Sequence, residues 1–145
     1  MTLPVLALHL AATWFMTGLI WLIQLVHYPL FSQVGPERFV AYHHAHSTLI
    51  TLIVGPVMLL EAATAVYLLA AFVAEPRAWV WWLAGGLLGI VWLSTAFLQV
   101  PMHAVLSQGF DPAAHARLVD TNWIRTVGWS ARAVLVTAWW VLRAP

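Results

Sequence analysis

Four long apolar stretches constrain this chain more than any other feature of its sequence. They cover residues 5–26, 47–73, 79–100 and 127–142, and a helix needs about 20 apolar residues to cross the hydrocarbon core of a membrane. Of the 145 residues, 63% are hydrophobic and only 8% are charged, which is more apolar surface than a soluble domain of this size can bury. We therefore predict an all-α fold: a single domain, residues 1–145, built as an up-down-up-down bundle of four transmembrane helices.

Charge and cysteine content exclude several classes of function. The chain has no cysteine, which excludes thiolate ligands and disulfides, and its six arginines form no basic run for nucleic acid. The first apolar stretch lacks the charged start and the cleavage site of a signal peptide, so we expect a retained helix. The partners we expect are the lipid bilayer and a hydrophobic small molecule in a bacterial inner membrane, and a homo-oligomer or a larger membrane complex stays open.

Five of the seven histidines lie where apolar stretches meet their connecting segments. His27 ends the first stretch, His43, His44 and His46 precede the second, and His103 follows the third. These positions meet at one membrane face of an up-down-up-down bundle, which we call the histidine end. A layer of imidazoles there is typical of a metal, haem or proton-handling site. We predict His27, His43, His46 and His103 as metal ligands, and we expect either His43 or His44 to face away because adjacent side chains cannot both point inward.

Two arginines open the fourth stretch on one helix face. Arg125 and Arg132 are seven residues apart with Trp129 one turn from each, and Gln99 lies one turn before His103. Few acidic residues are near, so the two guanidinium groups suit a phosphate, a carboxylate, a phenolate or haem propionates, with lipid phosphate as the alternative. We expect Arg132 to lie about 10 Å below Arg125, under the histidine layer. Catalytic candidates are Arg125, Arg132, Trp129 and Gln99; candidates for cofactor binding are His27, His103 and Arg132.

Glu61 is predicted to lie away from the histidine end. It follows His46 by 15 residues, about 22 Å along a helix, which places it at the level of His9 and Thr13. We expect it to face the bundle interior, either as a neutral acid bonded to Thr13 or His9 or as part of a proton relay.

The segments between the stretches carry weaker signals. Residues 36–46 and 112–122 each begin with proline and predict short surface helices, and Gly85, Gly86 and Gly89 predict close helix packing. The segments QLVHYPLFSQ and QVPMHAVLSQ are 75 residues apart and share Gln and Ser-Gln positions. They indicate either two duplicated helical hairpins or a chance similarity between two apolar helix ends.

Two segments resemble known families. The runs QVPMHAVLSQ, DPAAHARLVDTNW and WIRTVGWSARAVL resemble the anthrone oxygenase-like group of small four-helix membrane proteins, with Gln99 and His103 where that group often has asparagines. The resemblance implies oxygenation of an activated phenolic or polycyclic compound at a membrane. The first stretch, with His9, Trp14 and Gly18, is more weakly similar to the opening helix of haem-handling membrane proteins, among them a four-helix protoporphyrinogen oxidase and copper-resistance domains.

These observations favour a membrane-embedded oxidoreductase of the oxygenase type over two other classes. Its site would be lined by histidines and would act on a hydrophobic, phenolic compound, with an Fe or Cu ion or haem b as cofactor, while cofactor-free chemistry stays open. The alternatives are a structural or assembly subunit of a membrane complex and a small proton-coupled transporter. The positive-inside rule places the histidine end in the cytoplasm, because Arg38, Arg117 and Arg125 lie there.

Overall fold

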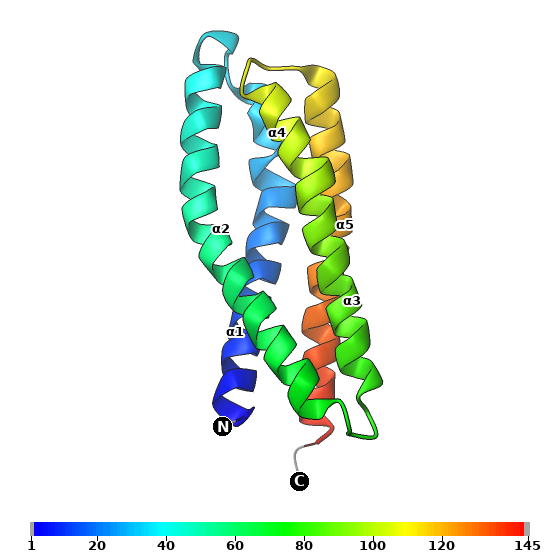
Figure 1. Ribbon diagram of the computed structural model, residues 1–145. Coiled ribbons are helices and arrows are strands. Elements are labelled where there is room, and N and C mark those ends of the chain that lie inside the picture. Colours follow the sequence, from blue (N-terminus) through cyan, green and yellow to red (C-terminus); the bar gives the residue numbers. More distant parts are fainter. Residues whose placement is uncertain (1, 144–145) are drawn as a thin grey trace.

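The computed structural model describes residues 2–143, which form an antiparallel bundle of four helical rods (Figure 1). The first rod ends in a π-helix and a 3-10 helix, and the third is interrupted by a π-helix. The elements are α1 (Thr2–Leu22), η1 (Ile23–His27), η2 (Pro29–Gln33), α2 (Pro36–Phe72), α3 (Trp79–Ser94), η3 (Thr95–Gln99), α4 (Val100–Leu106) and α5 (Pro112–Val141). The order of the rods is up-down-up-down, so the first and last helices have their free ends on the same side (Figure 1). The predicted all-α four-helix bundle is confirmed.

Two helices are longer than the apolar stretches predict. Residues 36–46 and 112–122 do not form separate surface helices but the first turns of α2 and α5. Proline occupies the first turn of each, and the Asp111 side chain caps α5 by accepting a hydrogen bond from the Ala114 backbone N–H at 2.7 Å. Neither glycine nor proline follows before Gly55 or Gly128, so nothing ends either helix early.

Three of the four rods are long and apolar enough to cross a membrane, namely Thr2–Gln33, Pro36–Phe72 and Trp79–Leu106. Their outward faces carry large exposed apolar side chains such as Leu52 and Phe97, as expected for contact with lipid. The fourth rod, α5, carries arginines but packs against α1 and α3. Helix α2 packs mainly against α1, with fewer contacts to α3, and it bends near Gly55 and Pro56 (Figure 1).

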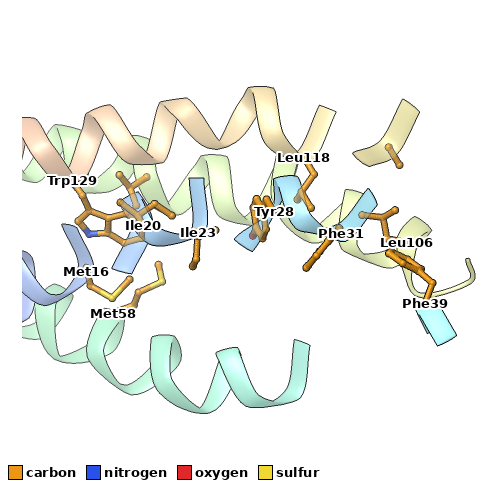
Figure 2. Packing of buried hydrophobic residues seen from close by; sticks show 12 residues of the cluster. Met16, Ile20, Ile23, Tyr28, Phe31, Phe39, Met58, Leu106, Leu118 and Trp129 are labelled. Carbon is orange, nitrogen blue, oxygen red and sulfur yellow. The ribbon is translucent and has the colours of Figure 1, made fainter. Parts of the chain in front are cut away.

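Apolar side chains pack in two clusters along the bundle axis. The larger one runs from Met16, Met58 and Trp129 in the middle to Phe31 and Phe39 at the histidine end (Figure 2). The smaller one contains Trp81 and Trp139, whose rings meet edge-on at 4.9 Å between centroids. The smaller cluster lies at the end of the bundle opposite the histidines.

Close helix packing comes from a glycine that the sequence analysis did not single out. A Cβ atom on Gly128 of α5 would lie 2.7 Å from the Val91 side chain of α3, so only glycine allows this approach. A Cβ atom on Gly85, Gly86 or Gly89 would meet nothing within 4 Å. Those three glycines therefore do not pack a helix against α3, contrary to our expectation, and they face open space.

The 75-residue spacing has a local structural counterpart. Ser32 donates to the Pro29 carbonyl and accepts from Gln33, and Ser107 and Gln108 repeat the same pattern with the Ala104 carbonyl. Each segment starts within a π-helix, η1 or η3. The similarity is closest at these two helix ends.

Candidate functional site at the histidine end

Four histidines from three elements form one group at the histidine end. His27 of η1 and His46 of α2 share a hydrogen bond of 2.7 Å between Nε2 and Nδ1, and His43 of α2 and His103 of α4 share one of 2.9 Å between Nε2 and Nδ1. The rings of His46 and His103 are 5.8 Å apart between centroids, which joins the two pairs. We call these four residues the imidazole group. The predicted histidine layer is confirmed, and His43 faces inward while His44 is exposed.

Local backbone structure brings these side chains together. His43 and His46 are three residues apart, which places them on the same face of α2. His27 ends the π-helix η1, and His103 follows the π-helix η3 by one turn. Single π-turns are often found at functional sites, because the extra residue redirects the side chains that follow.

A hydrogen-bonded chain leads from the imidazole group to a buried phenol. The Tyr28 hydroxyl lies 3.0 Å from His103 Nε2, so both ring nitrogens of His103 are engaged. His43 Nδ1 and His46 Nε2 are buried and have no hydrogen-bond partner among the described residues. The chain Tyr28–His103–His43 therefore connects three groups that can each donate and accept a proton.

Helix α5 supplies a polar face beneath this chain. Asn122 donates to Gln24 Oε1 at 2.9 Å, and Gln24 donates to the Val119 carbonyl at 3.2 Å. Gln99 donates to Thr121 Oγ1 at 2.8 Å. The two glutamines, one from the first rod and one from the third, thus fix α5 between them.

Arg125 is a buried cation whose hydrogen bonds go only to neutral groups. Its side chain is 5% exposed, and it donates to Asn122 Oδ1 at 3.2 Å and to Gln99 Oε1 at 3.5 Å. Its guanidinium carbon lies 5.4 Å from the centre of the Trp129 ring, and its Nε has no hydrogen-bond partner among residues 2–143. Within residues 2–143, the only two salt bridges involve other arginines. A buried guanidinium with this environment is suited to an anionic ligand.

A cavity of about 470 Å³ lies beside Arg125, between α2 and α3. Tyr28, Gln99, His103 and Arg125 form its polar wall, and the rest of the lining is mainly apolar and comes mostly from α2 and from the third rod, which consists of α3, η3 and α4. The lining residue Leu59 is 63% exposed on the outer surface of the bundle, so the cavity opens toward lipid. A hydrophobic molecule could therefore reach the polar wall without passing through water.

Arg132 belongs to a second polar group, deeper in the bundle, which we call the ion-pair group. Its Nη2 and Nε lie 3.2 and 3.4 Å from Glu61 Oε1, and it also donates to the Ala84 carbonyl. Thr13 and Trp129 donate to the Glu61 carboxylate at 2.8 and 2.9 Å. Glu61 faces inward beside Thr13 and Arg132, so its predicted position is confirmed. Arg132 also lies 3.5 Å from Nε2 of His9.

The expected position of Arg132 under the histidine layer is wrong. Because α5 begins at Pro112, Arg132 lies 20 residues into that helix, about 30 Å from its start. The expectation placed Arg125 at the histidine end and Arg132 about 10 Å below it, whereas Arg125 itself already lies 13 residues into α5. Trp129 lies between the two groups, since its ring contacts Arg125 and its Nε1 donates to Glu61.

Two further residues at the site were not predicted. Tyr28 is buried and bonds to His103, and the one sequence signal for it is its place beside His27 at the end of the first apolar stretch. His115, which lies in the segment expected to be a polar surface helix, bonds through Nε2 to the Tyr28 carbonyl at 2.8 Å. The sequence feature that could have indicated His115 is Pro112, three residues earlier, because it marks the start of α5 and so places His115 in the first turn of that helix.

In the part of the chain that the structure describes, no set of three or more His, Asp or Glu side chains is arranged to hold a metal ion.

Known proteins give no further guide to this site. No protein-family model, curated protein or solved structure matches the chain.

Proposed function

We propose that the protein is a membrane-embedded oxidoreductase of the oxygenase type, which takes an acidic, hydrophobic substrate such as a phenol from the bilayer. The observation that carries this proposal is Arg125, a buried guanidinium without a carboxylate partner at the wall of a cavity open to lipid. Because a cation is costly inside a membrane, an arginine kept there without a counter-ion favours a functional role.

The chemistry follows from the groups on the polar wall. His103 lies on the same wall as Arg125, and because both of its ring nitrogens are engaged, it would accept the proton of a phenol or of an enolisable ring through the Tyr28 hydroxyl, which bonds to its Nε2 and lines the same cavity. Arg125 would stabilise the resulting phenolate or enolate, and the proton could pass from His103 to His43. An electron-rich anion of this kind is the form that an oxidant attacks. The resemblance to the anthrone oxygenase-like group supports molecular oxygen as that oxidant.

Binding of a chromophoric phenol to the purified protein in lipid nanodiscs tests the proposal. We expect 4-nitrophenol to bind as the phenolate, with a shifted absorption band, and Arg125→Gln to weaken its binding about tenfold or more. Arg143→Gln is the matched control, because Arg143 is partly exposed and lies at the other end of the bundle. Equal binding by wild type and Arg125→Gln would show that the cavity does not recognise anions through Arg125.

A metal centre in the imidazole group is a second candidate. It is supported by the two buried nitrogens without partners, His43 Nδ1 and His46 Nε2. His27, His43, His46 and His103 would hold an Fe or Cu ion, or His27 and His103 would ligate haem b, and such a group would supply redox chemistry. Arg132 bonds to Glu61 in the structure, so Arg125 is the nearer arginine for haem propionates.

Elemental analysis and an absorption spectrum of the protein purified from cells decide this second candidate. We expect His27→Ala and His103→Ala to lose bound metal or haem, because each removes a ligand of one shared site. His44→Ala is the control, since His44 is exposed. Metal content that is unchanged in the first two variants would exclude the imidazole group as the ligand set.

A further inference from the structure

A second hollow continues the cavity along the same side of the bundle. It has a volume of about 620 Å³ and lies between α2 and α3, nearer the end opposite the histidines. Small side chains line it on both helices: Ala62 and Ala65 on α2, and Gly85, Gly86 and Gly89 on α3. These glycines have open space where a Cβ atom would stand, so the hollow exists because the side chains are missing.

The two hollows join at Trp92, which lines both. On α2, the cavity ends at Met58 and Leu59, and the second hollow begins one turn later at Ala62. From Ile50 to Leu69 the combined groove follows α2 for about 28 Å, close to the thickness of the hydrocarbon core, which is about 30 Å. We call it the α2–α3 groove.

The groove is polar at one end only. Tyr28, Gln99, His103 and Arg125 lie at the histidine end, and the lining beyond Trp92 consists of alanine, glycine, valine, leucine and tryptophan. The unpartnered Nε of the buried Arg125 marks where an anionic group would bind. We propose that the ligand of this groove has an acidic phenolic head at Arg125 and a long hydrocarbon tail lying along α3 over Gly85, Gly86 and Gly89. This inference rests on the proposed function and specifies its substrate class.

The physical contribution of the tail differs from that in a soluble protein. A tail that enters the groove leaves lipid rather than water, so it gains little from the hydrophobic effect. It gains van der Waals contacts with the groove walls and fixes the head in one orientation at the polar wall. Binding of the tail therefore depends on the shape of the groove and not on its apolar character. A larger side chain that fills the groove should displace the tail.

Two phenols and two glycine variants test the inference in nanodiscs. The probes are 4-ethylphenol and 4-dodecylphenol, with binding expressed per mole of lipid so that partition into the bilayer cancels. Gly89→Leu fills the groove without a clash at the Cβ atom, and Ala65→Leu fills it from the α2 wall. Gly18→Leu is the matched control, because Gly18 is an exposed helical glycine of α1 with nothing within 4 Å of its Cβ position.

We expect Gly89→Leu and Ala65→Leu to weaken binding of 4-dodecylphenol about tenfold or more and to leave 4-ethylphenol unchanged. Gly18→Leu should leave both probes unchanged. If both groove variants bind 4-dodecylphenol as wild type does, or lose both probes equally, the tail does not lie in the groove and the inference is overturned while the head site stands. If wild type binds neither probe, the proposed function fails and the inference fails with it.

Discussion

Arg125 and Arg132 lie two turns apart on one face of α5, yet the side chains around the two buried guanidinium groups differ in charge. Arg132 has 0% exposure and pairs with Glu61, which receives further hydrogen bonds from Thr13 and Trp129. Arg125 is almost as deeply buried but bonds only to the amides of Asn122 and Gln99 and lines a cavity. The charge of Arg132 is paired with a carboxylate of the protein, whereas the charge of Arg125 remains available to a ligand in the cavity.

This difference predicts a structural role for Arg132 and, under the proposed function, a ligand-binding role for Arg125. A buried ion pair whose members are all hydrogen-bonded strongly resists the loss of either partner. A buried cation without a carboxylate stabilises the fold little, and its desolvation is compensated when an anion binds. The ion-pair group should therefore dominate stability, and the histidine end with Arg125 should dominate activity.

The largest effect is expected at the ion-pair group. Arg132→Met leaves the Glu61 carboxylate buried without its cation, and it should lower the free energy of unfolding by about 3–5 kcal/mol. The double variant Glu61→Leu/Arg132→Met should recover most of this loss, because no unpaired charge remains. Unfolding titrations in mixed detergent micelles measure both. A single variant as stable as wild type would remove the contrast between the two regions.

His103 is expected to affect turnover strongly and the free energy of unfolding only a little. Since it joins Tyr28 to His43 and lines the cavity, His103→Ala should reduce turnover of a phenolic substrate about a hundredfold or more. Its effect on the free energy of unfolding should stay near the value for its two hydrogen bonds, about 2 kcal/mol. Oxygen consumption and the same unfolding titration give the two readouts. Equal turnover in wild type and His103→Ala would exclude His103 as the base.

Arg125 offers the sharpest comparison with Arg132. Arg125→Gln should cost about tenfold in affinity for a phenolate, while the free energy of unfolding should stay within about 1 kcal/mol of wild type or rise, since the desolvated charge is gone. Arg125→Lys should lie between wild type and Arg125→Gln in affinity, because the charge survives and the planar fork does not. If Arg125→Gln destabilises the fold as much as Arg132→Met, both arginines are structural.

The smallest effect is expected for the exposed ion pair at the opposite end of the bundle. Arg143 lies 3.0 Å from Glu75, and both side chains are about one third exposed. Glu75→Gln should change the free energy of unfolding by less than about 1 kcal/mol, because solvent screens such pairs. A thermal melt compared with Glu61→Leu tests whether burial accounts for the difference between the two pairs.

Topology made the imidazole group predictable from the sequence. Once four spans are accepted, the positions of His27, His43, His46 and His103 at span ends leave only one membrane face for them. The position of Glu61 near Thr13 followed from the constant rise of an α-helix. Both predictions needed only the length and order of the helices.

The partner of Arg132 and the role of Tyr28 could not be predicted in the same way. The polar start of α5 hid its true beginning, so Arg125 was placed at the histidine end although it lies 13 residues into that helix. The π-helix η1 changes the helical phase just before Tyr28, so a constant angle per residue does not give the direction of its side chain. A hydrophobicity pattern shows neither the start of α5 nor the π-helix η1.

The charged face of α5 also has a consequence for how the protein enters the bilayer. An arginine at the centre of a helix costs about 2.5–3.5 kcal/mol on insertion, and α5 carries Arg125 and Arg132 in its middle, whereas the three preceding rods are long and apolar enough to cross a membrane. Glu61 lies on one of those earlier rods, so a chain that inserts in sequence order brings the counter-charge for Arg132 into the membrane before α5. We therefore expect α5 to integrate last, by docking onto the three rods that precede it.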